Sequence, residues 1–341
     1  MTERTSVFKH VEQAPPDPIF GPQNAFLADK TAAKVNLVVG AYRTDEGKPW
    51  VLPSVKKVVF SHAVCVCVLV LTTESQAEER LAKSTSEHEY LPIDGLKEFN
   101  EGAAKLLLGA DAAAIKENRV VTVQNLSGSG SLRLGADFLS KYFPGKTVLI
   151  PDPTWANHVN IFLDARLNVA KYRYFEPKTI ALDLQGLLAD LQAAPDQSIV
   201  LLHVCAHNPT GIDPTKEQWL QILNVVKAKK HITFFDTAYQ GFATGDLEGD
   251  AYSVRLFEKA GLEFLTAQSF AKNMGMYGER IGALHIVLKD AAIAENIRSQ
   301  LKRLVRGSIS NPPAYGARIA ALVLNDPELF SIWYDPPCSI F

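Results

Sequence analysis

Short apolar runs that alternate with longer amphipathic segments constrain the fold of this chain more than any other feature of its sequence. Five runs are typical of strands, at 119–123, 147–150, 199–205, 232–235 and 264–267, and each is followed by turn residues. Because strands joined by crossover helices pair in parallel, the pattern predicts an α/β protein with a mostly parallel central sheet flanked by helices.

Three helices are predicted from apolar residues at helical spacing. The first follows the Gly/Ser turn at 127–130 and places Leu132, Ala136, Leu139 and Phe143 on one face. The second follows Asp213-Pro214-Thr215, which supplies cap and first-turn residues, and the third covers 293–304.

Composition limits the classes of partner. With 341 residues, of which 47% are hydrophobic, the chain is long and apolar enough for a large core. A formal charge of −2 gives no general attraction for nucleic acid or an anionic membrane, so small charged metabolites are the expected ligands. Residues 1–18 contain neither a signal core nor an Arg-rich transit pattern, which predicts a cytoplasmic protein.

The four cysteines do not indicate a metal site or a disulfide framework. They stand at 65, 67, 205 and 338, and none forms the paired CxxC spacing of a zinc site. We expect free, reduced thiols and no metal.

Residues that can take part in catalysis or ligand binding follow the predicted strands. In open α/β sheets, ligands bind beyond the carboxyl ends of the strands. The residues at these positions are Ser127, Gly128, Ser129, Trp155, Asn208, Asp236, Tyr239, Ser269 and Lys272. They make that edge of the sheet the expected site.

Each of these groups has a second interpretation. The Gly/Ser turn at 127–130 enters a helix and suits a phosphate, but a plain tight turn has the same composition. Asp236 follows an apolar run and would need a cation such as a protonated pyridine, or it caps the next turn. Lys272 can form a Schiff base if its surroundings lower its pKa, although most lysines are merely solvated.

Four segments together resemble the aspartate aminotransferase subgroup of the fold-type I pyridoxal-phosphate enzymes. They are 207–211 (HNPTG), 235–241 (FDTAYQG), 269–280 (SFAKNMGMYGER) and 310–314 (SNPPA), and the resemblance covers about 15–57 and 77–333. It implies the fold of that class, with pyridoxal 5'-phosphate as cofactor.

The resemblance also implies roles for individual residues. Lys272 would bind the cofactor covalently and move the substrate's α proton, Asp236 would keep the pyridine nitrogen protonated, and Tyr239 would bond the ring's phenolate oxygen together with Asn208. Trp155 would stack on the ring, and His158 and His203 would lie near the aspartate or be ordinary core histidines. The phosphate would be held by Ser127, Gly128, Ser129, Ser269 and Arg280, and by Tyr90 of a neighbouring subunit.

Acidic substrates are implied by one arginine. Arg306 stands where the family's arginine pairs with the distal carboxylate of the substrate across a homodimer, and Gly40 belongs to a segment that lines the entrance. Gly40, Trp155, Asn208 and Arg306 are therefore the expected substrate contacts. The resemblance implies transfer of an amino group from L-aspartate to 2-oxoglutarate, with an aromatic amino acid aminotransferase or an inactive, truncated cofactor-binding fragment as alternatives.

Two segments depart from the family pattern. Residues 58–76 have no counterpart, and an unspliced intron explains them better than a membrane segment or an added strand, because their removal restores helical spacing between Val55, Ala77 and Leu81. The tail at 334–341 also differs, and the small domain, with its arginine for the α-carboxylate, is expected to be incomplete. We expect an arm at 1–20, a small-domain segment at 21–50 and a large domain at 51–333.

Overall fold

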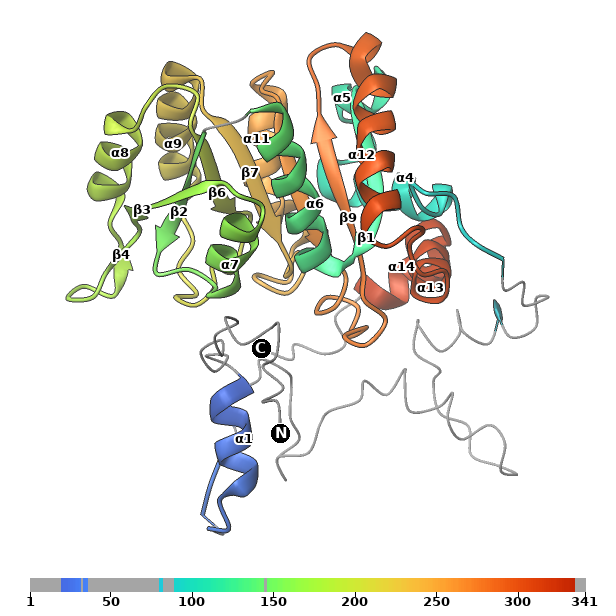
Figure 1. Ribbon diagram of the computed structural model, residues 1–341, viewed down its shortest axis with the longest axis horizontal. Helices are drawn as coiled ribbons and strands as arrows, with labels where there is room; N and C mark the ends of the chain where they lie inside the picture. The colour runs from blue at the N-terminus through green and yellow to red at the C-terminus, as the bar shows by residue number, and fades with distance from the viewer. Residues whose placement is uncertain (1–19, 32, 36–79, 82–88, 144–145, 335–341) are drawn as a thin grey trace, which may run out of the picture. The chain divides into compact units, whose positions relative to one another are not determined.

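The computed structural model describes residues 20–31, 33–35, 80, 81, 89–143 and 146–334 (Figure 1). The chain divides into two compact units, 1–51 and 52–341, and the first is represented by α1 (Phe20–Ala28) and the few residues after it. Gly40, the segment at 58–76 and the tail after residue 334 lie outside the described residues. The expected domain boundaries therefore stay a prediction.

Seven strands form the central sheet of the second unit. They are β1 (Val120–Leu126), β2 (Thr147–Asp152), β3 (Asn168–Arg173), β6 (Ile199–His203), β7 (Ile232–Thr237), β8 (Phe264–Ser269) and β9 (Ile281–Val287). Their order is β1-β9-β8-β7-β6-β2-β3, and β9 runs antiparallel to both of its neighbours, whereas all other pairs are parallel. The prediction of a mostly parallel sheet flanked by helices is confirmed.

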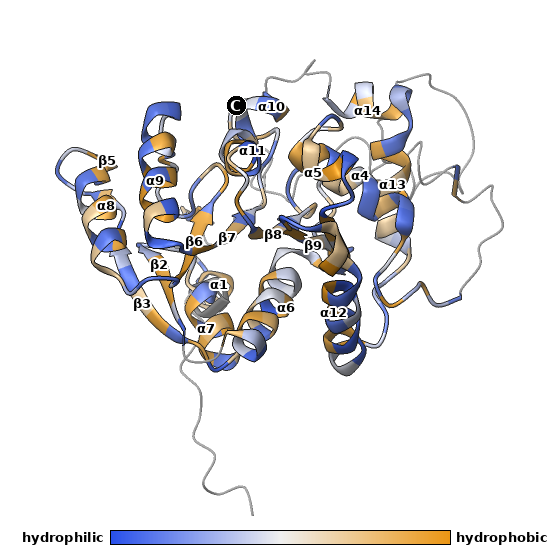
Figure 2. Cartoon of the chain, turned by 90° about the horizontal axis from the view of Figure 1, so that it is seen from above, coloured by the Kyte–Doolittle hydropathy of each residue, from blue (hydrophilic) through white to orange (hydrophobic). Residues whose placement is uncertain are grey.

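Helices cover both faces of this sheet, as Figure 2 shows. One face carries α6 (Ser127–Tyr142), α7 (Asn157–Asp164) and α12 (Ala294–Ser308), and the other carries α5 (Ala113–Lys116), α8 (Leu184–Ala193), α9 (Lys216–Lys229) and α11 (Tyr252–Lys259). Consecutive residues of a strand point to opposite faces. Phe234 and Phe235 of β7 accordingly enter the two separate cores, and both are fully buried.

A third apolar cluster lies around the chain that follows β8. It joins α4 (Lys97–Leu108), α13 (Tyr315–Asn325) and α14 (Pro327–Tyr334) to Phe270, Met274 and Met276. Phe270 packs edge-on against Phe99 of α4, with 5.3 Å between ring centroids. This cluster supports the turn that contains Lys272. The remaining elements are α10 (Leu247–Asp250), the 3-10 turn Ala291–Ile293 and the hairpin of β4 (Phe175–Glu176) and β5 (Ala181–Leu182).

The five predicted strands are present: four extend two or three residues further at their carboxyl ends, and β6 ends two residues earlier than predicted. The three predicted helices are α6, α9 and α12. Thr215 caps α9, in a reciprocal pair of hydrogen bonds with Gln218. One detail was wrong: Phe143 does not continue the buried face of α6, because the helix ends at Tyr142 and the Phe143 side chain is 37% exposed.

Two strands of the sheet were not predicted. β3 lies at the sheet edge and half of its residues are polar, so its apolar signal is weak. β9 is buried throughout but contains Gly282 and His285, which are uncommon in strands. His285 is tolerated because its two ring nitrogens lie 2.9 Å from Thr122 Oγ1 and 2.9 Å from Gln268 Oε1.

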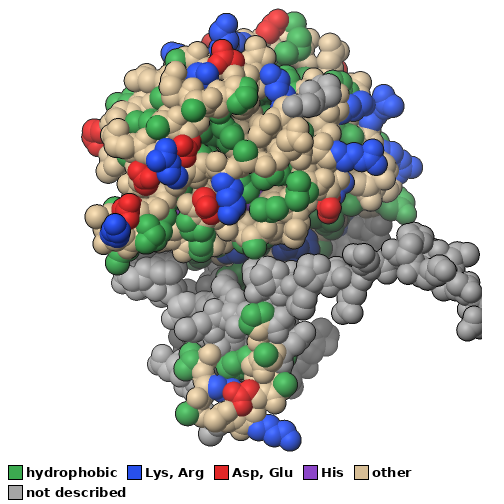
Figure 3. All heavy atoms as spheres, turned by 60° about the vertical axis from the view of Figure 1, so that its left-hand side comes forward, with side chains coloured by type: hydrophobic (Ala, Val, Ile, Leu, Met, Phe, Trp, Pro, Cys, Tyr) green, Lys and Arg blue, Asp and Glu red, His purple; other side chains and the backbone are tan. Residues whose placement is uncertain are grey.

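The surface agrees with the small net charge. On the face drawn in Figure 3, basic and acidic side chains are scattered among apolar ones. The described helices are all too short or too polar to serve as membrane spans.

Close packing of α6 on β7 depends on one glycine. A Cβ atom at Gly135 would lie 2.3 Å from Phe234 Cζ, so we expect Gly135→Ala to lower the free energy of unfolding by about 1–3 kcal/mol. Gly307→Ala in α12 is the matched control, because a Cβ there meets nothing within 4 Å. Urea unfolding checks both variants, and equal stability of the two would contradict this packing.

Candidate active site

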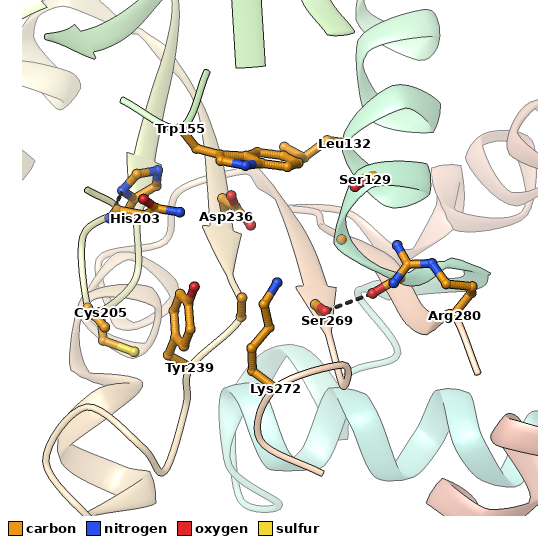
Figure 4. A pocket seen from close by; sticks show the side chains of 15 residues that line it. Ser129, Leu132, Trp155, His203, Cys205, Asp236, Tyr239, Ser269, Lys272 and Arg280 are labelled. Carbon is orange, nitrogen blue, oxygen red and sulfur yellow. Dashed lines mark hydrogen bonds between the residues drawn. The ribbon is translucent and has the colours of Figure 1, made fainter. Parts of the chain in front are cut away.

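A cavity opens at the carboxyl ends of the parallel strands, beside the N-terminus of α6 (Figure 4). Its lining comprises Ser127, Gly128, Ser129, Leu132, Trp155, His203, Cys205, Ala206, Asn208, Asp236, Ala238, Tyr239, Ser269, Lys272 and Arg280. The structure thus brings together ten of the predicted site residues from segments far apart in the sequence. Their individual roles stay predictions.

The turn from β1 into α6 presents unpaired backbone donors to the cavity. The helix starts at Ser127 and has no side-chain cap, so N–H groups of its first turn are available to an anion, which the helix dipole also favours. Ser127 has a positive φ of 58° and its Oγ lies 2.8 Å from Ser269 Oγ. The turn and the end of β8 are therefore joined directly.

Gly282 makes this turn fit, and sequence reasoning missed it. A Cβ at Gly282 would lie 2.7 Å from the Ser127 Cα and 2.4 Å from the Gln268 carbonyl oxygen. Any larger residue in this part of β9 would push the turn away from Ser269. The signal in the sequence was a glycine inside an apolar run, which often marks a close backbone approach.

Asp236 is the acidic group of the cavity. Its side chain is only 15% exposed, and Oδ2 lies 3.0 Å from Nε2 of the fully buried His158. The other ring nitrogen of His158 lies 2.8 Å from Thr154 Oγ1, which fixes the orientation of the ring. A cationic group in the cavity would further stabilise a carboxylate buried to this extent.

A row of aromatic rings forms the wall behind Asp236. The His203 ring lies 5.3 Å from His158 and 4.4 Å from His207, which stacks on Tyr174 at 3.8 Å between centroids. Burial lowers the pKa of His203 well below its ordinary value and that of His207 to about 3, so both are neutral near pH 7.

His158, His203 and Asp236 have ligating atoms within 4.8 Å of one another. They could therefore hold either a divalent transition metal or a protonated ring nitrogen.

Asn208 lies in a turn that Asp213 holds in place. The Asp213 carboxylate accepts hydrogen bonds from the backbone N–H groups of Ala206 (2.6 Å) and His207 (2.9 Å). Burial raises its pKa even so. The sequence had assigned Asp213-Pro214-Thr215 together to the cap and first turn of the following helix; of these residues, Thr215 is the N-cap. Asp213 instead accepts hydrogen bonds within the turn that precedes the helix.

Lys272 and Tyr239 face each other across the cavity floor. The Lys272 Nζ lies 5.8 Å from the centroid of the Tyr239 ring, and Figure 4 shows the amine pointing towards Asp236 below the Trp155 ring. Burial lowers the pKa of Lys272, with Asp236 opposing and Arg280 adding to the shift. Burial raises the pKa of Tyr239, and Asp236 adds to that shift. Lys272 is thus closer to a neutral nucleophile than an ordinary lysine, while Tyr239 keeps its proton.

Two predicted residues do not line the cavity within this chain. Tyr90 is 85% exposed, and Arg306 is exposed near the end of α12, where it bonds Ser310 Oγ and Asn311 Oδ1. Both were expected to act on a neighbouring subunit. In contrast, Cys205 lines the cavity although the sequence suggested an unremarkable thiol, and Leu132, Ala206 and Ala238 were not singled out.

Comparisons with known proteins agree on one family. The family model for aminotransferase class I and II matches residues 32–335. The chloroplastic aspartate aminotransferase of Arabidopsis thaliana is 52% identical over 330 residues, which are 97% of this chain and 69% of that protein.

Solved structures agree with this. The cytoplasmic aspartate aminotransferase of Saccharomyces cerevisiae is similar with a TM-score of 0.88 at 47% identity, over 96% of this chain and 77% of that one. The aromatic-amino-acid aminotransferase of Burkholderia pseudomallei, covalently bound to pyridoxal phosphate, has a TM-score of 0.87 at 41% identity, over 97% and 78% of the two chains.

The lowered pKa of Lys272 gives a pH-dependent stability that can be measured. Between that pKa and the ordinary one near 10.5, the unfolded chain binds more protons than the folded one, so stability rises with pH. In cofactor-free protein we expect Lys272→Met to be more stable than the wild type at pH 7, by a margin that narrows towards pH 10. Lys178→Met, at an exposed position, is the control. A margin that is constant with pH, measured by denaturant unfolding, would contradict the burial of this amine.

Proposed function

The chain belongs to the aminotransferase class I and II family, and we propose that it transfers the amino group of L-aspartate reversibly to 2-oxoglutarate, giving oxaloacetate and L-glutamate. The observation that carries the proposal is the cavity in which the Lys272 amine, the Asp236 carboxylate and the N-terminus of α6 converge from separate segments. Identity of 52% to a chloroplastic aspartate aminotransferase supports aspartate as the substrate.

We propose pyridoxal 5'-phosphate as the cofactor, because the cavity offers a matching group for each part of it. The helix N-terminus suits a phosphate, Asp236 suits a protonated pyridine nitrogen, and Lys272 suits an aldehyde. The space above the turn exists because residue 128 is glycine: a Cβ there would lie 3.2 Å from the Ser269 Cβ.

The remaining lining residues would orient this cofactor. Ser127, Ser129, Ser269 and Arg280 would donate to the phosphate together with the first-turn N–H groups of α6, and the planar Arg280 guanidinium can donate in a bidentate way. Trp155 would cover one face of the ring. Asn208 and the protonated hydroxyl of Tyr239 would bond the phenolate oxygen.

When bound, pyridoxal phosphate carries the amino group and supplies an electron-withdrawing ring that stabilises negative charge at the substrate's α carbon. The protein supplies the proton transfer. The Lys272 Nζ accepts a proton from the α carbon of the amino acid, and in the second half of the cycle it delivers one to the α carbon of the acid that receives the amino group. Its lowered pKa increases the neutral fraction that can act as the base. Asp236, oriented by His158, would keep a proton on the ring nitrogen.

We propose that the dicarboxylic substrates are held partly by a second subunit. Arg306 would pair with the distal carboxylate, and Gly40 would line the entrance. The exposure of Tyr90 and Arg306 in the single chain supports a homodimer in which both residues complete the neighbouring site. The cytoplasm is the compartment that we propose, and a yeast cytoplasmic aspartate aminotransferase is among the similar proteins.

Substrate choice is tested by steady-state kinetics of the purified protein loaded with pyridoxal phosphate. We expect kcat/KM for aspartate with 2-oxoglutarate to exceed that for phenylalanine by at least about 10-fold, the effect of roughly 1.4 kcal/mol in transition-state binding. The reverse order would favour an aromatic amino acid aminotransferase. Cofactor binding without turnover of either acid would favour an inactive fragment.

The role of Arg306 is tested with a matched pair of variants. Arg306→Ala is expected to lower kcat/KM for aspartate by about 10- to 100-fold, because a charge-assisted hydrogen bond contributes about 1.5–3 kcal/mol, and to affect phenylalanine less. Arg303→Ala, at another exposed arginine of α12, is the control and should change neither value. Equal losses in the two variants would show that Arg306 does not select the acid.

A further inference from the structure

Lys272 and Tyr239 stand on two turns that the sheet itself does not join. The last register pair between β7 and β8 is Thr237 with Gln268, and the two segments then leave the sheet. Tyr239 comes two residues after Thr237, and Lys272 comes four residues after Gln268. Some other contact must fix the separation of the two side chains.

We propose that Gln240 and Asn273 form a bridge that positions Lys272 relative to Tyr239. Asn273 Nδ2 donates a hydrogen bond of 3.3 Å to the backbone carbonyl of Gln240. Each bridge residue directly follows the residue that it positions, and both are buried. Neither lines the cavity, so both act through the backbone as positioning residues.

Each end of the bridge is anchored to a helix. The Gln240 Nε2 donates to the carbonyl of Leu106 in α4 at 2.9 Å and to that of Leu247 in α10 at 3.1 Å. At the other end, the indole N–H of Trp333 in α14 donates to the Asn273 carbonyl at 2.8 Å. The two turns are therefore tied to each other and to the third apolar cluster. If the hydrogen bond between Asn273 and Gln240 were the only contact, the two turns could move together relative to the helices. The additional bonds to α4, α10 and α14 restrict that movement.

The bridge matters for proton transfer because the Lys272 pKa depends on burial. If the turn loosens, water reaches the amine and its pKa moves back towards the ordinary value. The Tyr239 hydroxyl would also lose its fixed distance from the amine. This inference rests on the proposed function for its catalytic consequence, although the hydrogen bonds exist independently of it.

Asn273→Ala tests the bridge in protein loaded with pyridoxal phosphate. We expect the pH midpoint of the absorbance band of the lysine-bound cofactor to shift by at least about 0.5 unit, and kcat for aspartate to fall about 10-fold with KM changed by less than about 3-fold. Asn100→Ala is the matched control, because Asn100 is a buried asparagine whose Nδ2 donates to the Asp94 carbonyl at 2.8 Å, away from the cavity. An unchanged midpoint in Asn273→Ala, or an equal shift in both variants, would overturn the proposal.

Trp333→Phe provides a second test that keeps an aromatic ring at this position and removes the indole donor. We expect the pH midpoint to shift in the same direction as in Asn273→Ala but by a smaller amount. An unchanged midpoint would contradict the anchoring of Asn273 by α14. This variant also decides the matter if Asn273→Ala does not fold.

Hydrogen exchange separates failure of the bridge from failure of the proposed function. The Gly275 N–H donates to the Lys272 carbonyl at 3.0 Å, so its exchange reports the Lys272 turn in cofactor-free protein. It should accelerate in Asn273→Ala and not in Asn100→Ala, and equal rates would overturn the bridge. A wild-type protein that shows no cofactor band would contradict the proposed function and leave this comparison decisive for the bridge.

Discussion

Burial of the Asp236 carboxylate at the end of β7 is the constraint on which the rest of the site depends. The sheet places this group where water is scarce, and the hydrogen bond from His158 at 3.0 Å is the contact that holds its orientation. Neighbouring His203 is neutral because of burial and adds no positive charge. A cation in the cavity would stabilise this carboxylate, and the protonated ring nitrogen of the proposed cofactor would be such a partner. The same carboxylate raises the pKa of Lys272, but burial lowers that pKa more, so the net shift is downward.

The part of the cavity beside the N-terminus of α6, where an anion would bind, depends on the close approach of the Ser127 turn to β9 as well as on charge. Gly282 lets Ser127 approach β9, and Gly128 leaves open the space beside Ser269. The first turn of α6 then offers its N–H groups to an anion in the cavity that Asp236 also lines. Arg280 adds the full positive charge that the helix dipole lacks. The proposed cofactor, with a phosphate at one end and a basic ring nitrogen at the other, would be held at both ends at once.

Much of this could be predicted from the sequence, because strand ends in a parallel sheet converge on one edge. The five apolar runs located five strands, and the residues predicted from the ends of those strands are among the residues that line the cavity. What escaped prediction depends on tertiary contacts. β9 was not predicted because it contains Gly282 and His285. Gly282 suits the strand because Ser127 packs against it, and His285 suits it because Thr122 and Gln268 bond its ring nitrogens. The pairing of Gln240 with Asn273 likewise joins residues that lie 33 positions apart in the sequence.

The central claim is that Lys272, and no other lysine, carries the cofactor. The most direct test is to incubate the purified chain with pyridoxal 5'-phosphate, reduce it with borohydride, digest it and locate the added mass by mass spectrometry. The account predicts one modified peptide, with the label on Lys272, and no labelling of that peptide in Lys272→Met. Labelling spread over exposed lysines, or a single label at another lysine, would contradict it.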